Sequence, residues 1–181
     1  MTFARPIVQK DAARERLARR GGLFFALRRR EPEKIELIYF PYYLFELALL
    51  VKGGKQSVFV ASDGVLGDLA FLEPETLEFV EQVDAPHFDF HLDMETAKAK
   101  VLDECQWILV KHGFHRKSPP RVEAVKNTES FYYPYWVAYY KQRRGYDFKA
   151  VDGFSLAPIG IRMRRAFLAA FAQQQLGQAS S

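Results

Sequence analysis

The sequence contains very little cysteine and histidine, and this scarcity limits the chemistry open to it. Cys105 is the single cysteine among 181 residues, and there are four histidines. One cysteine excludes a disulfide within the chain and any metal site built from several cysteines. We expect Cys105 to be an inert buried thiol, because it falls on the apolar stripe of a predicted helix. The scarcity fits a reducing compartment, so we expect a cytoplasmic protein.

Long apolar runs without charges are also lacking. The first 17 residues have no apolar core of the length that a signal peptide needs. The longest apolar run, residues 35–51, contains Glu36, Pro41 and Glu46. A membrane-spanning helix needs about 20 apolar residues and rarely holds two carboxylates. We therefore expect neither an export signal nor a membrane span.

Acidic residues are scarce near the N-terminus. Residues 1–30 hold nine Arg or Lys residues and two acidic ones, a local net charge of +7, whereas the whole chain has +4. Such a segment is typically a solvated basic helix, and it can also contact nucleic-acid phosphates, an anionic membrane surface or an acidic protein. Nucleic-acid association through this segment is an alternative function, with Arg28, Arg29 and Arg30 as its binding residues.

Aromatic residues, by contrast, are abundant, with sixteen Phe, nine Tyr and two Trp. Phe and Tyr favour half-buried strands. Apolar residues at odd positions from 35 to 49 predict a strand with one buried face. Gly53-Gly54 predicts a hairpin turn, and residues 57–62 the returning strand. A second extended block covers residues 131–142, turns at 143–145 and returns at 146–151.

Helical patterns occur at residues 9–20 and 94–112, the second with Asp93 as its N-cap. Residues 76–83 predict a short helix, and Pro158 is suited to the first turn of a final helix. Between them, residues 86–92 alternate like a strand. Phe88, Phe90 and Leu92 would then face one way, and the polar residues between them the other.

The polar side of that strand carries His87, Asp89 and His91. Two imidazoles two residues apart on a strand can share one metal ion. A usable site needs a third ligand, and the local sequence places none. We therefore expect no metal and no cofactor, and a metal-dependent enzyme ranks third among the possible functions.

Two stretches of the chain resemble each other. YFPYYL at 39–44 aligns with YYPYWV at 132–137, and F-x-A-x-D-G at 59–64 aligns with the same pattern at 148–153. A predicted helix precedes each stretch. We interpret this as a duplication, with units at 1–85 and 86–181. The expected fold is α+β, with two divergent copies of a helix-plus-antiparallel-hairpin unit whose sheets are covered by helices on one face. The units would lie side by side or join into one longer sheet.

Pro41 and Pro134 occupy matching places in the two copies. Proline inside a strand removes a ladder donor, so it belongs at an edge, a strand start or a bulge. The aromatic residues around it either pack the sheet against its helix or form a surface that grips a partner. Tyr42, Tyr135 and Trp136 are therefore candidate binding residues. Trp107 is another, because it lies off the apolar stripe of its helix, where it packs on the other copy or marks a contact surface.

A helix followed by a hairpin whose second strand ends in Asp-Gly, with a Tyr-Pro strand, resembles the PepSY-like repeats of bacteria. The similarity covers residues 9–67 and 93–153. The chain departs from that family, because VLG at 65–67 and FSL at 154–156 stand where Thr-Gly is expected. It also lacks the export signal common in such proteins. No active-site residue transfers.

The resemblance implies a non-catalytic module that binds or modulates other proteins. We therefore expect a non-enzymatic binding or regulatory module of bacterial type. Its partner would be a protein, with a second copy of the chain as one possibility through unpaired sheet edges.

Overall fold

The computed structural model describes residues 1–18, 31–71, 74–113, 120–143 and 145–179, so Arg28, Arg29 and Arg30 lie outside the described residues. Within the described ranges the expected α+β fold is confirmed, with one seven-stranded sheet and three α-helices. The strands are β1 (Thr2–Ala4), β2 (Lys34–Val51), β3 (Gly54–Asp63), β4 (Leu69–Phe71), β5 (Phe79–Val80), β6 (Arg121–Lys141) and β7 (Tyr146–Asp152). The helices are α1 (Lys10–Ala18), α2 (Met94–Gly113) and α3 (Ile161–Ala179).

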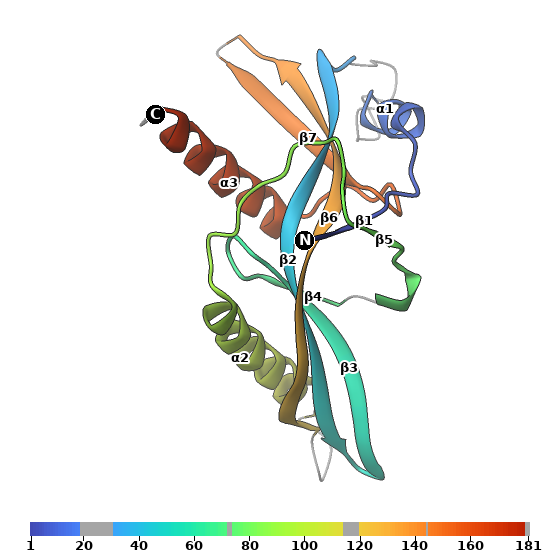
Figure 1. The fold of residues 1–181 in the computed structure, drawn as a ribbon, viewed down its shortest axis with the longest axis vertical. Helices are drawn as coiled ribbons and strands as arrows, with labels where there is room; N and C mark the ends of the chain where they lie inside the picture. The colour runs from blue at the N-terminus through green and yellow to red at the C-terminus, as the bar shows by residue number, and fades with distance from the viewer. Residues whose placement is uncertain (19–30, 72–73, 114–119, 144, 180–181) are drawn as a thin grey trace.

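The long antiparallel pair β2–β6 forms the centre of the sheet (Figure 1). Phe40 lies opposite Tyr133, so the two Tyr-x-Pro-Tyr segments face each other. Each long strand then joins its own hairpin partner, β2 to β3 and β6 to β7. The two predicted extended blocks therefore belong to one continuous sheet, the second of the two expected arrangements.

Both prolines lie in the interior of this central pair, contrary to the expectation of an edge, a strand start or a bulge. The register shifts fall elsewhere, between Glu46 and Leu47 and between Ala48 and Leu49. The carbonyl oxygen of Pro41 accepts a hydrogen bond from Gly64, which lies on the side away from β6. Because the N and O of one strand residue point to the same side, the missing proline N–H costs the β2–β6 ladder nothing.

Two short segments occupy the outer sides of the long strands where the hairpins end. Strand β1 runs parallel to β6, with Phe3 opposite Tyr132. Residues 86–88 run parallel to β2 through one bridge, His87 opposite Tyr39. There the Tyr39 N–H donates to Pro86 O at 2.9 Å, so backbone groups that β3 does not reach are satisfied.

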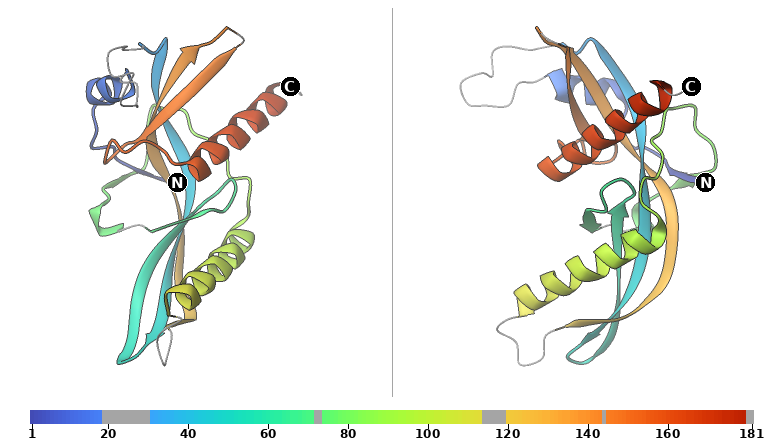
Figure 2. Two further views of the ribbon diagram at one scale, coloured as in Figure 1. Left: turned by 180° about the vertical axis from the view of Figure 1, so that it is seen from behind. Right: turned by 90° about the vertical axis from the view of Figure 1, so that its left-hand side faces the viewer.

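Helices cover both faces of the β2–β6 pair. Helix α2 packs Ala97, Val101 and Cys105 against odd-numbered residues of β2, and α1 packs at the other end of that same face. Helix α3 places Phe167 on Phe40, on the even-numbered face. The expectation of helices on one face is therefore wrong for α3, because the even positions of β2 are largely apolar too and need burial. Figure 2 shows α2 and α3 near opposite ends of the bent pair.

Three local predictions need correction. Residues 76–83 form no helix, since a 3-10 turn (Pro74–Thr76) precedes the short strand β5. Residues 86–92 do not form the predicted strand, and their ladder pairing is limited to the bridge at His87. Phe88 packs on Phe40 and Phe90 on Tyr43, which lie on opposite faces of the sheet, because the segment crosses the sheet edge. Helix α3 begins at Ile161, whereas Pro158 bridges to Val151. The predicted Asp93 cap is confirmed, with Thr96 N donating to Asp93 Oδ1 at 2.8 Å.

None of the helices in the described ranges is long and apolar enough to cross a membrane.

The two tryptophans should respond differently to truncation. Trp136 is 9% exposed and its Nε1 donates to Val8 O at 2.9 Å, whereas Trp107 is 60% exposed. We expect Trp136→Ala to lower the free energy of unfolding by about 3–5 kcal/mol, and Trp107→Ala by about 0.5 kcal/mol or less. Denaturant unfolding of both variants measures the difference. Equal losses would contradict the different packing of the two rings.

Candidate functional site

Two aspartate turns end the hairpins and are built in the same way. Asp63 Oδ1 accepts hydrogen bonds from Val65 N at 3.0 Å and Leu66 N at 2.6 Å. Asp152 Oδ1 accepts from Phe154 N and Ser155 N, both at 2.8 Å. Each aspartate side chain therefore stabilises the turn that follows it.

A glycine follows each aspartate because the turn folds tightly onto the proline of the long strand. A Cβ atom added to Gly153 would lie 2.6 Å from Pro134 O, and one added to Gly64 would lie 3.2 Å from the Pro41 Cβ and 2.5 Å from the ring of Phe90. Any side chain would push the turn off its strand, so each turn position requires glycine.

Between the turns, the tyrosines that follow the two prolines meet. The hydroxyls of Tyr42 and Tyr135 are 2.8 Å apart, and Tyr42 Oη also lies 3.3 Å from Met163 Sδ of α3. The β2–β6 register places both rings on one face of the sheet, beside the Phe40–Tyr133 pair. Burial raises the pKa of both hydroxyls above the ordinary value of 10.0, so they are protonated at neutral pH.

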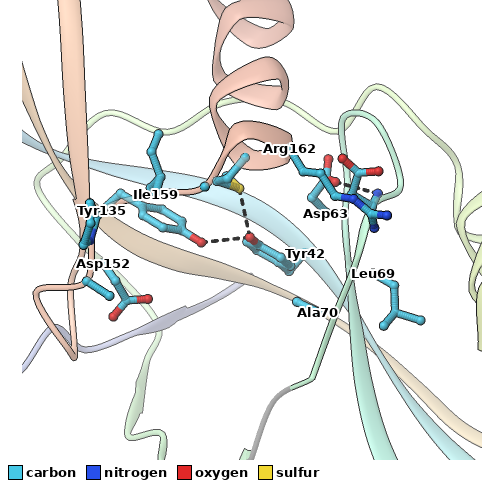
Figure 3. A pocket seen from close by; sticks show the side chains of 13 residues that line it. Tyr42, Asp63, Leu69, Ala70, Tyr135, Asp152, Ile159 and Arg162 are labelled. Atoms are coloured by element: carbon cyan, nitrogen blue, oxygen red, sulfur yellow. Dashed lines mark hydrogen bonds between the residues drawn. The ribbon is translucent and has the colours of Figure 1, made fainter. Parts of the chain in front are cut away.

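These tyrosines form the floor of a cavity of about 240 Å³, which we call the junction pocket (Figure 3). Strand β4, both aspartate turns and the first turn of α3 supply its walls. It is lined by Tyr42, Asp63, Asp68, Leu69, Ala70, Tyr135, Asp152, Ala157, Pro158, Ile159, Gly160, Arg162 and Met163.

Charge in the junction pocket is mainly negative. Three carboxylates, Asp63, Asp68 and Asp152, line it together with one cation, Arg162, whose Nη1 lies 2.6 Å from Glu104 Oε1 of α2. Burial raises the pKa of Asp63, although three backbone N–H groups partly offset that effect. Asp152 is held by Tyr133, whose hydroxyl donates to Asp152 Oδ2 at 3.0 Å. The pocket can therefore hold a positively charged or hydrogen-bond-donating group.

The structure brings together two of the predicted binding residues, Tyr42 and Tyr135. Both are buried, as is Trp136, so the packing interpretation holds for these aromatics. Trp136 lies on the opposite face, among the residues that pack on α1. Trp107 is exposed on α2, with Lys111 Nζ 4.8 Å from its ring centre.

The candidate metal ligands His87, Asp89 and His91 and the thiol of Cys105 do not line the junction pocket. No group of three His, Cys, Asp or Glu side chains that could hold a metal ion occurs in the described part of the chain, His87, Asp89 and His91 included. Cys105 is buried, and burial raises the pKa of its thiol to about 11. The thiol is therefore protonated at neutral pH, and a protonated thiol is a poor nucleophile.

Sequence reasoning missed the residues that close the junction pocket. Asp68 follows the first turn, and its N–H donates to Asp63 Oδ2 at 2.7 Å. Arg162 and Met163 arrive from α3, about 100 residues farther along the chain. The spacing of Asp68 after Asp-Gly was a usable signal, whereas nothing local to α3 indicates what it covers.

Comparisons with protein-family models, curated proteins and solved structures gave no match to the chain.

Removing either hydroxyl of the tyrosine pair should destabilise the fold unequally. Tyr42→Phe leaves the buried Tyr135 hydroxyl without its partner, so we expect a loss of about 1–3 kcal/mol in the free energy of unfolding. Tyr135→Phe leaves Tyr42 with Met163, and we expect about 0.5–1.5 kcal/mol. Denaturant unfolding at pH 7 checks the order, and the reverse order would contradict the role of Met163 as a second partner of Tyr42.

The same pair predicts a pH dependence. Because the folded pKa values exceed that of the unfolded chain, their stabilisation is complete below pH 10 and is lost as pH rises further. Stability measured from pH 8 to 11 should therefore fall above pH 10, and less steeply in Tyr42→Phe.

Proposed function

We propose that the chain is a non-enzymatic binding module built by duplication of one helix-plus-hairpin unit. Its partner is a protein that inserts a basic side chain into the junction pocket. The observation that carries this proposal is the pocket itself, a small, mostly acidic cavity closed by residues from both halves of the chain.

Matching hydrogen bonds in the two halves support the duplication. Gly64 N donates to Pro41 O at 2.8 Å, and Gly153 N donates to Pro134 O at 3.0 Å. In the turns themselves, Gly67 and Leu156 occupy the same place and both have positive φ, 80° and 59°. A left-handed leucine is uncommon, so its occurrence opposite a glycine indicates a shared turn geometry.

The segments before α1 and α2 also correspond. Gly64 O accepts hydrogen bonds from His91 N and Leu92 N, and Gly153 O accepts from Ile7 N and Val8 N. In each half a helix starts two residues later.

Side chains repeat this correspondence. Tyr43 Oη donates to Leu92 O at 2.9 Å, and Trp136 Nε1 donates to Val8 O at 2.9 Å.

Superposition of the halves with Pro41 over Pro134 and Asp63 over Asp152 tests the duplication. A fit no better than that of shifted pairings would contradict it.

The size and charge of the junction pocket favour one side chain of a partner. Small-molecule sites usually measure about 300–1,000 Å³, more than the 240 Å³ found here. A Lys or Arg side chain has an apolar stem and a cationic end, and it suits a pocket with apolar walls and three carboxylates. Tyr135 Oη adds a free acceptor lone pair if its proton goes to Tyr42.

A protein partner also agrees with what the PepSY-like resemblance implies. A second copy of the chain is one such partner, because β3 pairs with β4 only over Val60–Ser62. Residues 54–59 therefore have no strand on their outer side within the described ranges, and open strand edges favour pairing between chains.

Blocking the junction pocket should remove the partner without unfolding the protein. Gly160 lines the pocket, its φ is not positive, and a Cβ there meets no atom within 4 Å. Gly160→Trp therefore adds a ring at the pocket without backbone strain. We expect proteins captured from the native host by the wild type to be lost in this variant.

Ala172→Trp is the matched control, because Ala172 is exposed on α3 and does not line the pocket. The control should retain every partner of the wild type, and thermal unfolding should show both variants folded. Partners that bind Gly160→Trp and the wild type alike would rule out the junction pocket as the binding site.

Nucleic-acid association through residues 1–30 is the second candidate function. The described part of this segment supports it, since Lys10, Arg14 and Arg16 are all exposed on α1. These side chains continue the basic character of Arg28, Arg29 and Arg30, which lie outside the described residues.

Salt dependence tests this second candidate. If residues 1–30 contact phosphates, affinity for an oligonucleotide should fall steeply as salt rises from 50 to about 200 mM. Substituting Arg28, Arg29 and Arg30 with Ala should then weaken binding to all sequences and reduce the salt slope. Absence of a gel shift at low salt would remove this candidate.

A further inference from the structure

A second cavity, of about 270 Å³, lies between α1, β7 and α3, and we call it the cationic cleft. Three basic side chains line it, Arg16 from α1, Lys149 from β7 and Arg164 from α3, and no Asp or Glu residue is among its described lining. The apolar part of the lining that a ligand can reach includes Pro158, which is exposed, and Ile159, which is half-buried. The cleft is thus opposite in charge to the junction pocket.

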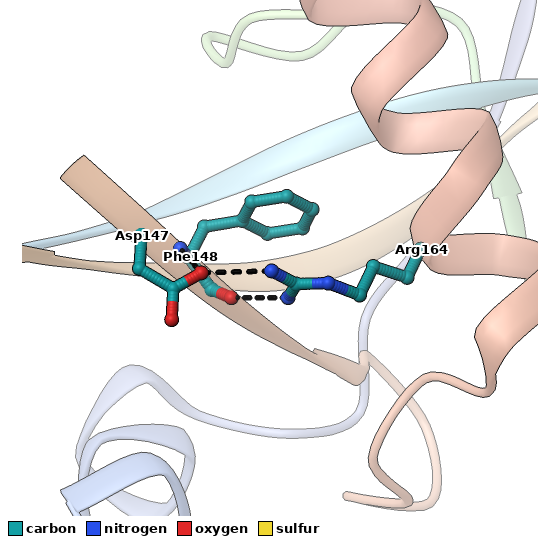
Figure 4. Close-up of polar contacts among 3 residues, drawn as sticks. All are labelled: Asp147, Phe148 and Arg164. Carbon is teal, nitrogen blue, oxygen red and sulfur yellow. Dashed lines mark hydrogen bonds and ion pairs between the residues drawn. The ribbon is translucent and has the colours of Figure 1, made fainter. Parts of the chain in front are cut away.

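Arg164 is held in place at the cleft (Figure 4). Its Nη1 donates to Phe148 O at 2.6 Å, its Nη2 donates to Asp147 Oδ1 at 2.7 Å, and its guanidinium carbon lies 4.6 Å from the ring centre of Phe148. These contacts use two of its five N–H groups. Its remaining N–H groups can donate to a carboxylate or phosphate. Because the guanidinium is planar and already fixed, its side chain loses little conformational entropy on binding.

The other two cations carry uncompensated charge. Asp147 offsets Arg164, but neither Arg16 nor Lys149 forms an ion pair with a residue of the described ranges. A bound anion would relieve the repulsion between Arg16, Lys149 and the other positive charge of the cleft. Pro158 and Ile159 in turn gain from contact with an apolar body, because both still have surface exposed to water.

We propose that the cationic cleft binds a small amphipathic organic anion, with its carboxylate or phosphate at Arg16, Lys149 and Arg164 and its apolar body against Pro158 and Ile159. This site is separate from the junction pocket and does not depend on the function proposed there.

Calorimetric titration of the full chain with matched probes tests the proposal. Phenyl phosphate and benzoate carry the two anionic groups on the same ring, benzyl alcohol is neutral, and benzylamine is cationic. We expect one or both anions to bind at least about ten-fold more tightly than the other two, since hydrogen bonds to charged groups contribute most of the difference. Tighter phenyl phosphate would indicate a phosphate ligand, and tighter benzoate a carboxylate.

Charge variants locate the binding. Arg16→Gln with Lys149→Gln removes two exposed cations of the cleft, and Arg14→Gln with Lys52→Gln removes two exposed cations outside it. The first double variant should weaken the anions about ten-fold or more, and the second should leave their Kd unchanged. Both should melt at the temperature of the wild type. Failure of both anions to bind, equal binding of all four probes, or equal losses in the two double variants would overturn the proposal.

Discussion

The structure depends on the contact between each aspartate turn and the proline of the neighbouring long strand. The carbonyl oxygens of Pro41 and Pro134 each accept the N–H of the glycine that ends a hairpin. Each bond contributes only about 0.5–1.5 kcal/mol. Its position matters more, because the same two glycines offer their carbonyl oxygens to the segments that lead into α1 and α2. Each small turn thereby holds on the sheet the segment that leads into a helix.

The two halves of the chain are interdependent. Strand β1 pairs with β6, whereas residues 86–88 bridge to β2. Each short segment therefore completes a long strand that belongs to the other half. The core follows the same rule, since Ala97 and Val101 of α2 pack on β2 residues from the first half. Each half therefore relies on the other to bury part of its apolar surface, so the sheet and its helices form one unit.

Two cavities of opposite charge follow from this arrangement. The junction pocket is acidic because both aspartate turns converge beside β4, and their carboxylates must stay there to hold backbone N–H groups. The cationic cleft is basic because α1 and α3 both approach β7, where Arg164 covers a backbone carbonyl at the sheet edge. In both places groups that stabilise the fold also place charge in the cavity. Tyr42 and Tyr135 stay protonated at neutral pH, because burial raises the pKa of both hydroxyls.

Local spacing in the sequence determined the kind of each long strand and of α2, and several of their ends. Alternating apolar residues determined the long strands, Gly53-Gly54 the hairpin, and Asp93 the start of α2, because each depends on neighbours within a few residues. Only the tertiary structure decided that α3 covers the even face of β2, that residues 86–92 cross the sheet edge, and that Tyr42 meets Tyr135. That last contact joins residues 93 positions apart. It depends on strand register and on packing from both faces, which no local pattern encodes.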